Sequence, residues 1–328
     1  MPEPIRWGII GTGFIADMVC ADLALARGNV IEAVAARDVG RAADFAARYG
    51  ATSSYGTYQE LVANVDVDVV YIATTHPHHR DQALLAIAAG KPVLIEKPLC
   101  LNATDARTVF EAAREAGVFA MEAMWMRTNP LIRKAVDLVA EGAIGALRGI
   151  RDEFGLGLPY DATHRLYDLS NGGGGLLDLG VYPATFAYLF LGRPDEIKTT
   201  GTLSASGADD TVAMEWFYSG VSKAQLSSSV SIPVPNQAAI LGTEGWIVVE
   251  GGARRPSGLV VHSRGAEYRI EDPIAGQGYG YVPQIEEVER CLRTGLLESP
   301  LIPQADTVAI LEVLDEARAA LGVKYPGE

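Results

Sequence analysis

Cysteine is scarce in this chain of 328 residues. Only Cys20, Cys100 and Cys291 occur, and no two of them form a Cys-x-x-Cys pair. An odd and scattered set argues against a disulfide framework and against a cysteine-bound zinc site. We expect each cysteine to be a small residue in the core or near the surface.

Long apolar runs and clusters of basic residues are also lacking. No apolar run approaches the roughly 20 residues that a membrane-spanning helix needs. The first residues, Met-Pro-Glu-Pro-Ile-Arg-Trp-Gly, lack the basic stretch and the apolar segment of a secretory signal. We therefore expect a cytoplasmic protein with no membrane partner. A net charge of -14 without a Lys/Arg cluster argues against nucleic acid as a partner.

The composition is that of a folded globular protein, with 48% hydrophobic and 21% charged residues, and the length fits two domains. Up to residue 123, apolar strand-like runs alternate with helical segments, which predicts a doubly wound parallel sheet of six strands. Five of these strands are placed at Ile5–Ile10, Val30–Ala36, Val67–Ala73, Val93–Glu96 and Val118–Glu122. Helices are predicted at Phe14–Arg27, Arg41–Tyr49, Thr57–Ala63, His79–Ala89 and Thr104–Ala116.

The chain after Ala123 has a different pattern. Short strand-like segments follow one another from Ile197 to Ile270, which predicts a large and mainly antiparallel sheet. Further elements are a strand at Leu147–Phe154 and helices at Pro130–Glu141, Leu176–Leu191, Val282–Arg293 and Gln304–Leu321. We predict an α/β domain over residues 1–123 and an α+β domain with an open-faced sheet over residues 124–328.

A glycine-rich turn follows the first strand and opens the first helix. Its sequence, Gly11-Thr12-Gly13-Phe14-Ile15-Ala16, matches the dinucleotide-binding pattern G-x-G-x-x-G/A in the context that this pattern requires. Gly11 permits the tight turn, Gly13 lets the backbone approach a pyrophosphate, and the helix N-terminus favours the phosphates. The alternative is a turn that serves packing only. We predict that this turn binds a nicotinamide dinucleotide.

The end of the second strand bears on the choice of cofactor. NAD enzymes usually place an acid there, whereas an arginine accommodates the extra phosphate of NADP. Arg37 takes this place, Asp38 follows one position later, and Arg41 lies at the start of the next helix. We predict NADP rather than NAD, with Asp38 as the residue that complicates the choice.

Three motifs carry a resemblance to a known family: the glycine fingerprint, Glu96-Lys97-Pro98, and the run Gly-Gly-Gly-Gly-Leu-Leu-Asp-Leu-Gly-Val-Tyr from Gly172 to Tyr182. With these motifs the chain resembles the Gfo/Idh/MocA oxidoreductase family over nearly its whole length. Glu122-Ala123-Met124-Trp125-Met126-Arg127 and the final tyrosine resemble its dihydrodiol dehydrogenase and NADP-dependent xylose dehydrogenase branch. Many members carry histidine where this chain has Tyr182. The resemblance implies an NADP-dependent dehydrogenase.

Hydride transfer from an alcohol also requires movement of the hydroxyl proton, so the site needs an acid/base group. Lys97 follows a strand of the parallel sheet, at the edge where such sheets bind ligands, and its ammonium can stabilise a developing alkoxide. A tyrosine has a pKa of about 10, which a nearby lysine would lower. We therefore predict Tyr182 as the proton donor and acceptor, Lys97 as its electrostatic partner, and Asp178, four residues before Tyr182, as the group that orients the substrate hydroxyl.

The histidine-rich sequence His76-Pro77-His78-His79 follows the fourth strand, and no acidic or thiolate residue lies near it in sequence. We therefore predict no metal site there. The resemblance implies that this loop lies along the nicotinamide ribose. Further cofactor contacts are expected from Thr74, His76, His79, Glu96 and Lys97. Substrate contacts are expected from Trp125, Arg127, His164 and Arg165.

The leading functional hypothesis is an NADP-dependent dehydrogenase or reductase that acts on a sugar, a sugar derivative or a cyclic diol. The alternatives are a non-catalytic NADP-binding regulator and a hydrolase or lyase that uses the cofactor transiently on a glycoside. We also expect a homodimer through the second domain's sheet. Segments such as Thr211–Phe217, with Val212, Met214 and Trp216, alternate apolar and polar residues, so the exposed face of this sheet is expected to be apolar enough to pair.

Overall fold

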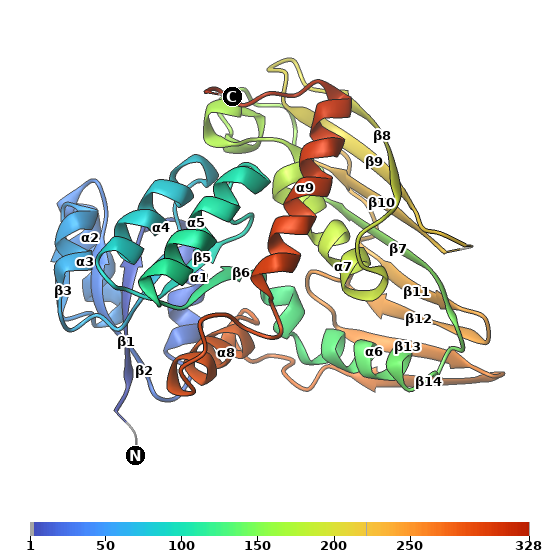
Figure 1. The fold of residues 1–328 in the computed structure, drawn as a ribbon, viewed down its shortest axis with the longest axis horizontal. Helices are drawn as coiled ribbons and strands as arrows, with labels where there is room; N and C mark the ends of the chain where they lie inside the picture. The colour runs from blue at the N-terminus through green and yellow to red at the C-terminus, as the bar shows by residue number, and fades with distance from the viewer. Residues whose placement is uncertain (1–2, 221, 328) are drawn as a thin grey trace. The chain divides into compact units, whose positions relative to one another are not determined.

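The computed structural model describes residues 3–220 and 222–327, which form two compact units (Figure 1). Unit 1 contains the chain up to Thr128 and also the segment Gly276–Thr307. Unit 2 contains Asn129–Ala275 and the chain from Val308 onward. The boundary after residue 123, which we placed for the functional domains, stays a prediction. The contacts within the structure group the late segment Gly276–Thr307 with the first part of the chain.

Unit 1 is built on a six-stranded parallel sheet with the order β3-β2-β1-β4-β5-β6. Its strands are β1 (Ile5–Ile10), β2 (Asn29–Ala35), β3 (Ser53–Tyr55), β4 (Val69–Ile72), β5 (Val93–Glu96) and β6 (Ala120–Ala123). The strand order reverses between β1 and β4, and doubly wound sheets bind ligands beside such a point, at the carboxyl ends of the strands. The predicted doubly wound parallel sheet is confirmed.

The helices of unit 1 follow the apolar periodicity of the sequence, and the strands β4, β5 and β6 are buried on both faces, whereas β3 at the sheet edge is half-exposed. The helices are α1 (Phe14–Leu23), α2 (Val39–Tyr49), α3 (Tyr58–Ala63), α4 (His79–Ala88), α5 (Ala103–Ala116) and α8 (Val282–Arg293). Two short 3-10 helices lie at His76–His78 and Trp125–Thr128. The first helix is shorter than predicted, because a turn follows Leu23. The three cysteines are buried and form no disulfide.

A buried carboxylate explains why the late segment joins unit 1. Asp22, near the end of α1, is fully buried and accepts hydrogen bonds from the backbone N–H groups of Tyr279 (2.8 Å) and Tyr281 (2.7 Å). The following helix α8 packs against α1. A buried charge is stable only where it is hydrogen-bonded, so Asp22 fixes this segment in unit 1.

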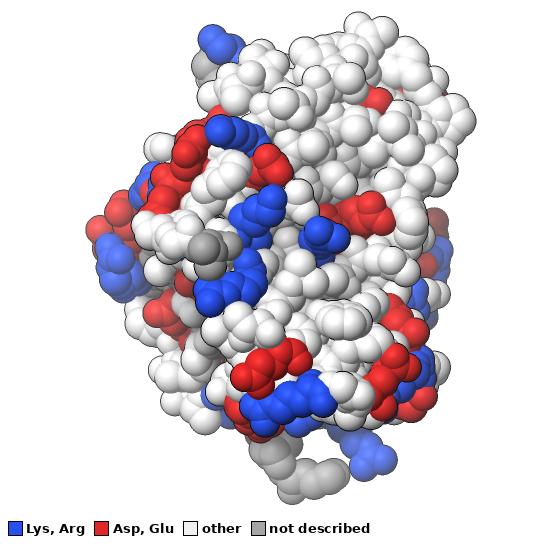
Figure 2. Space-filling model, turned by 90° about the vertical axis from the view of Figure 1, so that its right-hand side faces the viewer, with Lys and Arg blue, Asp and Glu red and all other residues white. Residues whose placement is uncertain are grey.

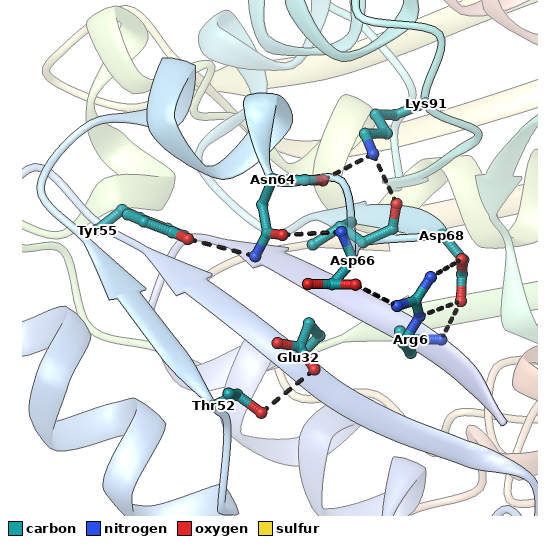
Figure 3. A network of polar contacts seen from close by, with 9 residues as sticks. Arg6, Glu32, Thr52, Tyr55, Asn64, Asp66, Asp68 and Lys91 are labelled. Atoms are coloured by element: carbon teal, nitrogen blue, oxygen red, sulfur yellow. Dashed lines mark hydrogen bonds and ion pairs between the residues drawn. The ribbon is translucent and has the colours of Figure 1, made fainter.

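A polar network lies at the amino ends of the parallel strands (Figure 3). Arg6 at the start of β1 binds Asp66 at 2.7 Å and Asp68 at 2.9 Å, both just before β4. Lys91, before β5, donates to the backbone carbonyl oxygen of Asn64 at 2.8 Å. These contacts pair the charges at the edge of the sheet opposite to the one where ligands bind, so we assign them a structural role.

Unit 2 is built on an eight-stranded sheet with the order β14-β13-β12-β11-β7-β10-β9-β8. Its strands are β7 (Leu147–Gly155), β8 (Glu196–Leu203), β9 (Asp209–Phe217), β10 (Lys223–Ser229), β11 (Ala238–Gly242), β12 (Gly245–Glu250), β13 (Gly258–Ser263) and β14 (Ala266–Glu271). All neighbouring pairs are antiparallel except β7 with β10. The predicted mainly antiparallel sheet is confirmed.

Helices cover one face of this sheet: α7 packs on β7 and β10, and α6 packs on β13. These are α6 (Pro130–Ala140) and α7 (Val181–Leu191), with a π-helical turn at Leu176–Gly180 before α7 and 3-10 turns at Arg165–Tyr167 and Leu169–Asn171. Helix α9 (Gln304–Leu321) continues into unit 2 from the late segment of unit 1.

The stretch Leu169–Leu191 corrects the expectation that no apolar run approaches the length of a membrane-spanning helix. It is long and apolar enough, with a mean hydropathy of 1.3, to meet the composition of a membrane span. However, 78% of the 18-residue window within it that has this composition is buried inside the protein, as in the core helix of a globular domain. It also begins with 3-10 and π-helical turns rather than one regular helix. The apolarity of this stretch reflects its central place in the core of unit 2.

The side chains of β9 show which face of the sheet is covered. The expected apolar exposed face is not formed by Val212, Met214 and Trp216. These three side chains are buried, at 0–1% exposure. The open face instead carries the alternate residues of β9, among them Ala213 and Glu215. Figure 2, which views the molecule from the side of this open face, shows uncharged surface over a large area, with charged side chains in separate groups.

Candidate functional site

The loop between β1 and α1 carries the glycine fingerprint. Gly11 has a φ of +100°, and a Cβ there would lie 2.8 Å from the carbonyl oxygen of Ala73, so the turn requires glycine. Gly13 is the N-cap of α1, and a Cβ built on it would meet no other atom within 4 Å. Open space at a helix N-terminus fits a bound pyrophosphate. Thr12 and Ile15 are partly exposed, and Phe14 is 82% exposed.

Arg37, Asp38 and Arg41 are exposed just beyond the end of β2. The Asp38 carboxylate accepts a hydrogen bond from the backbone N–H of Arg41 (2.9 Å) and thereby caps α2. Within residues 3–220 and 222–327, neither guanidinium forms an ion pair. Asp38 is therefore occupied by the helix, while both arginines are available to an anion. This arrangement fits the 2′-phosphate of NADP.

The backbone around Lys97 is held from three sides, beginning with Glu96. The Glu96 carboxylate is buried, accepts the Tyr71 hydroxyl at 2.6 Å and accepts the backbone N–H of Lys97 at 3.2 Å. Burial and the Glu96 charge together raise the pKa of Tyr71 well above its usual value, so this phenol stays a donor. Glu96 is thus committed to positioning Lys97, and its predicted cofactor contact stays a prediction.

His79 bridges the ends of β4 and β5. Its ring nitrogens lie 3.1 Å from the carbonyl oxygen of Pro98, the residue after Lys97, and 3.1 Å from that of Thr74. Burial lowers the pKa of His79 to about 4, so the ring is neutral near pH 7 and its single N–H makes only one of these two contacts a hydrogen bond. The side chain has no exposed surface, so we assign it a role in holding these two loops, and its predicted cofactor contact stays a prediction.

Glu122 is a positioning residue that sequence reasoning did not identify. This carboxylate at the end of β6 accepts the backbone N–H of Leu99 (3.1 Å) and the Thr307 hydroxyl (3.0 Å). Burial raises its pKa, while the hydrogen bonds from Thr307 and Leu99 oppose that rise. The available signal was a lone acid in the otherwise apolar strand Ala120–Ala123, which implies a buried partner.

The remaining predicted residues of unit 1 are engaged inside that unit. The Thr74 hydroxyl donates to Gln82 at 2.7 Å, and His76 is buried with its ring 5.8 Å from that of His79. No group of three or more His, Cys, Asp or Glu side chains that could hold a metal ion occurs in the described part of the chain.

Trp125 and Arg127 lie on the short 3-10 helix after β6. The Trp125 ring is buried and packs on Tyr281, with centroids 4.7 Å apart. The buried Arg127 guanidinium pairs with Asp306 at 2.7 Å. Both side chains are fixed by the late segment that returns to unit 1. Their predicted substrate contacts stay predictions.

In unit 2, Asp178 lies in the π-helical turn before α7. It is buried and pairs with the exposed Arg165 at 3.0 Å. His164 caps the turn before it, because its ring nitrogen accepts the backbone N–H of Leu166 at 3.3 Å. Since the turn is π-helical, the four-residue spacing to Tyr182 is not that of a regular α-helix. Arg165 provides a cationic partner for the buried Asp178 carboxylate.

Tyr182 is the second residue of α7 and is 5% exposed. It lines a pocket of unit 2, where its ring lies edge-on to Phe154 with centroids 5.8 Å apart. The glycines before it permit close packing: a Cβ on Gly173 would lie 2.6 Å from the Arg165 carbonyl oxygen. The glycine run therefore brings the Arg165 turn close to the helical stretch that carries Asp178 and Tyr182.

Comparison with known proteins agrees with this architecture. Residues 5–124 match the oxidoreductase family with an NAD-binding Rossmann fold, and residues 132–248 match the GFO/IDH/MocA C-terminal domain. The chain therefore belongs to the Gfo/Idh/MocA oxidoreductase family. Trans-1,2-dihydrobenzene-1,2-diol dehydrogenase of Mus musculus is 39% identical over 335 residues, 98% of each chain. The human enzyme of that name is 36% identical, also over 98% of each chain.

Solved structures show the same fold. An aldose-aldose oxidoreductase from Caulobacter crescentus complexed with glycerol has a TM-score of 0.89 at 22% identity, covering 98% of each chain. A 3-ketoreductase from Actinomadura kijaniata in complex with NADP and TDP-benzene has a TM-score of 0.85 at 25% identity, covering 97% of this chain and 98% of that one. The chain is thus an oxidoreductase, and the predicted resemblance to the family is confirmed.

Proposed function

We propose that this enzyme transfers a hydride between NADP(H) and a secondary alcohol or carbonyl of a sugar, a sugar derivative or a cyclic diol. The observation that carries the proposal is the carboxyl edge of the unit 1 sheet. The turn at Gly11 and Gly13 leaves open space at a helix N-terminus, and Lys97, after β5, belongs to the same edge. The dihydrodiol dehydrogenase and oxidoreductase relatives support the choice of substrate class.

The proton chemistry is assigned to three side chains. NADP(H), when bound, supplies the hydride acceptor or donor. Tyr182 takes the proton from the substrate hydroxyl during oxidation and returns it during reduction. The Lys97 ammonium stabilises negative charge on the substrate oxygen and favours the tyrosinate. Asp178, held by Arg165, accepts a hydrogen bond from a substrate hydroxyl and orients it.

The preference for NADP rests on Arg37 and Arg41, whose side chains form no ion pair in the described chain, and on Asp38, whose carboxylate caps α2. In a screen of pentoses, hexoses and cyclic diols, followed by absorbance of the reduced cofactor, we expect turnover with NADP⁺ well above that with NAD⁺. Replacing Arg37 with Asp should raise KM for NADP⁺ by roughly 10- to 100-fold, as expected for loss of a charge-assisted contact, and change KM for NAD⁺ far less.

An unchanged cofactor preference in Arg37→Asp would overturn the NADP assignment. No turnover with any substrate, despite NADPH binding measured by fluorescence, would instead favour a regulator. Tight cofactor retention and no net formation of NADPH during conversion of a glycoside would favour the transient use of the cofactor by a hydrolase or lyase.

We also propose that the enzyme is a homodimer formed by the open face of the eight-stranded sheet. The support is the broad uncharged surface on this side (Figure 2) and exposed or half-exposed apolar residues such as Trp246 and Val248. Light scattering should give twice the chain mass of 34.9 kDa. A monomer mass at micromolar concentration would contradict the proposal.

A further inference from the structure

The pocket beside Tyr182 contains a charge that the proposed reaction does not use. The pocket is lined by Asp152, Glu153, Phe154, Tyr182, Asn236 and the turn Gly251–Arg254, all of which belong to unit 2. Arg254 is the one cationic side chain among these lining residues.

The Arg254 guanidinium is stacked rather than paired. Its central carbon lies 4.7 Å from the centroid of the Phe154 ring, and the same ring contacts Tyr182 edge-on. Arg254 is half-buried and forms no hydrogen bond or ion pair with the part of the chain that the structure describes. A guanidinium stacked on an aromatic face keeps its N–H edges directed outward, where they can bind a ligand.

The turn that carries Arg254 is rigidly built. Gly251 and Gly252 both have a φ of +79°, and a Cβ on Gly252 would lie 2.6 Å from the carbonyl oxygen of Asn236. Asp152 and Ala253, which line the same pocket, are both buried. The position of Arg254 beside Phe154 is therefore set by the fold of unit 2.

The surrounding charges favour an anion with a single charge. Burial raises the pKa of Asp152 well above its usual value and so disfavours a negative charge there that would compete for Arg254. Glu153 also lines the pocket without forming an ion pair to Arg254. A single guanidinium beside Glu153 suits a singly charged carboxylate better than a doubly charged phosphate. It can bind the carboxylate through two parallel hydrogen bonds.

We propose that Arg254 determines substrate specificity by binding a carboxylate, and that the substrate is a sugar acid or a carboxylated cyclic diol. The carboxylate pairs with Arg254 while the reacting hydroxyl lies at Tyr182. The placement of the reacting hydroxyl at Tyr182 rests on the proposed function, whereas recognition of the carboxylate by Arg254 does not.

The test compares acidic and neutral sugars of the same ring: D-glucuronate with D-glucose, and D-galacturonate with D-galactose. D-glucose 6-phosphate is included to test whether the site prefers a phosphate to a carboxylate. We expect the wild-type enzyme to prefer the uronates in kcat/KM with NADP⁺. Arg254→Gln should lower kcat/KM for them by roughly 10- to 100-fold, mainly through KM, and lower it far less for the neutral sugars. Arg254→Lys should recover part of the loss.

Arg255→Gln is the matched control, because this neighbouring arginine is exposed and does not line the pocket. It should leave the ratio of acidic to neutral substrates unchanged. Calorimetric binding of the same sugars in the presence of NADPH separates this inference from the proposed reaction. Binding of a uronate that Arg254→Gln abolishes would support the inference even without turnover.

Three results would overturn the inference. The first is that no uronate binds more tightly than its neutral counterpart. The second is that Arg254→Gln leaves the ratio of acidic to neutral substrates unchanged. The third is that only glucose 6-phosphate shows a preference that depends on Arg254, which would assign the site to phosphate.

Discussion

Replacing Lys97 with methionine is expected to lower kcat by roughly 10²- to 10³-fold, the range seen when an enzyme loses one preorganised charge or donor at its reacting oxygen. Methionine reaches as far as the Cε atom of lysine, with sulfur in place of one methylene group, and lacks the ammonium group. Because the backbone there is held by Glu96, His79 and Glu122, the loop should keep its course. Fluorescence titration with NADPH should therefore show nearly unchanged affinity.

Lys91→Met is the matched control, because Lys91 precedes the same strand β5 that Lys97 follows. Its ammonium donates to the carbonyl oxygens of Asn64 and Val67, so its loss should lower the melting temperature rather than kcat. Turnover retained within a few-fold in Lys97→Met, with NADPH still bound, would refute the role of Lys97.

Tyr182→Phe is expected to lower kcat by roughly 10²- to 10⁴-fold, the usual range for loss of a general acid/base. The phenyl ring keeps the edge-on contact with Phe154, so the pocket should be preserved and KM should change little. The pH profile gives the sharper measurement. The wild-type kcat for oxidation should rise with pH as the phenol loses its proton, and the variant should lose this limb.

Tyr188→Phe removes a hydroxyl from the same helix, six residues further on, and should keep both kcat and the pH profile. A Tyr182→Phe enzyme with the wild-type pH limb would show that another group moves the proton. In that case Asp178, which pairs with Arg165, would be the next candidate.

The order of elements in this protein could be predicted because its strands and helices have clear apolar periods. Helices α8 and α9 and strands β1 and β5 have the predicted bounds. Strand β3 was not placed, because Ser53-Ser54-Tyr55 is short and polar. Its place at the sheet edge is given by pairing with β2 rather than by its own sequence. The covered face of β9 was misjudged, since alternation alone does not tell which face meets the helices.

A local motif allowed site residues to be proposed from the sequence at Gly11 and Lys97, and their functional roles stay predictions. The supporting contacts of the site could not be predicted, because they join residues far apart in sequence. Examples are Glu122 to Leu99 and Arg127 to Asp306. Arg254 had no local signal either, since an arginine in a glycine-containing turn resembles any solvated residue. Only its stacking on Phe154 distinguishes it.

Because Gly276–Thr307 returns to unit 1 and the chain from Val308 belongs again to unit 2, each unit is assembled from two separate stretches of the chain. A fragment cut near residue 123 would leave the buried Asp22 carboxylate without the N–H groups of Tyr279 and Tyr281. Each unpaired buried group costs about 1–3 kcal/mol, a large part of the stability of a domain. A transplant of the cofactor-binding unit into another protein must therefore carry two separate stretches of chain.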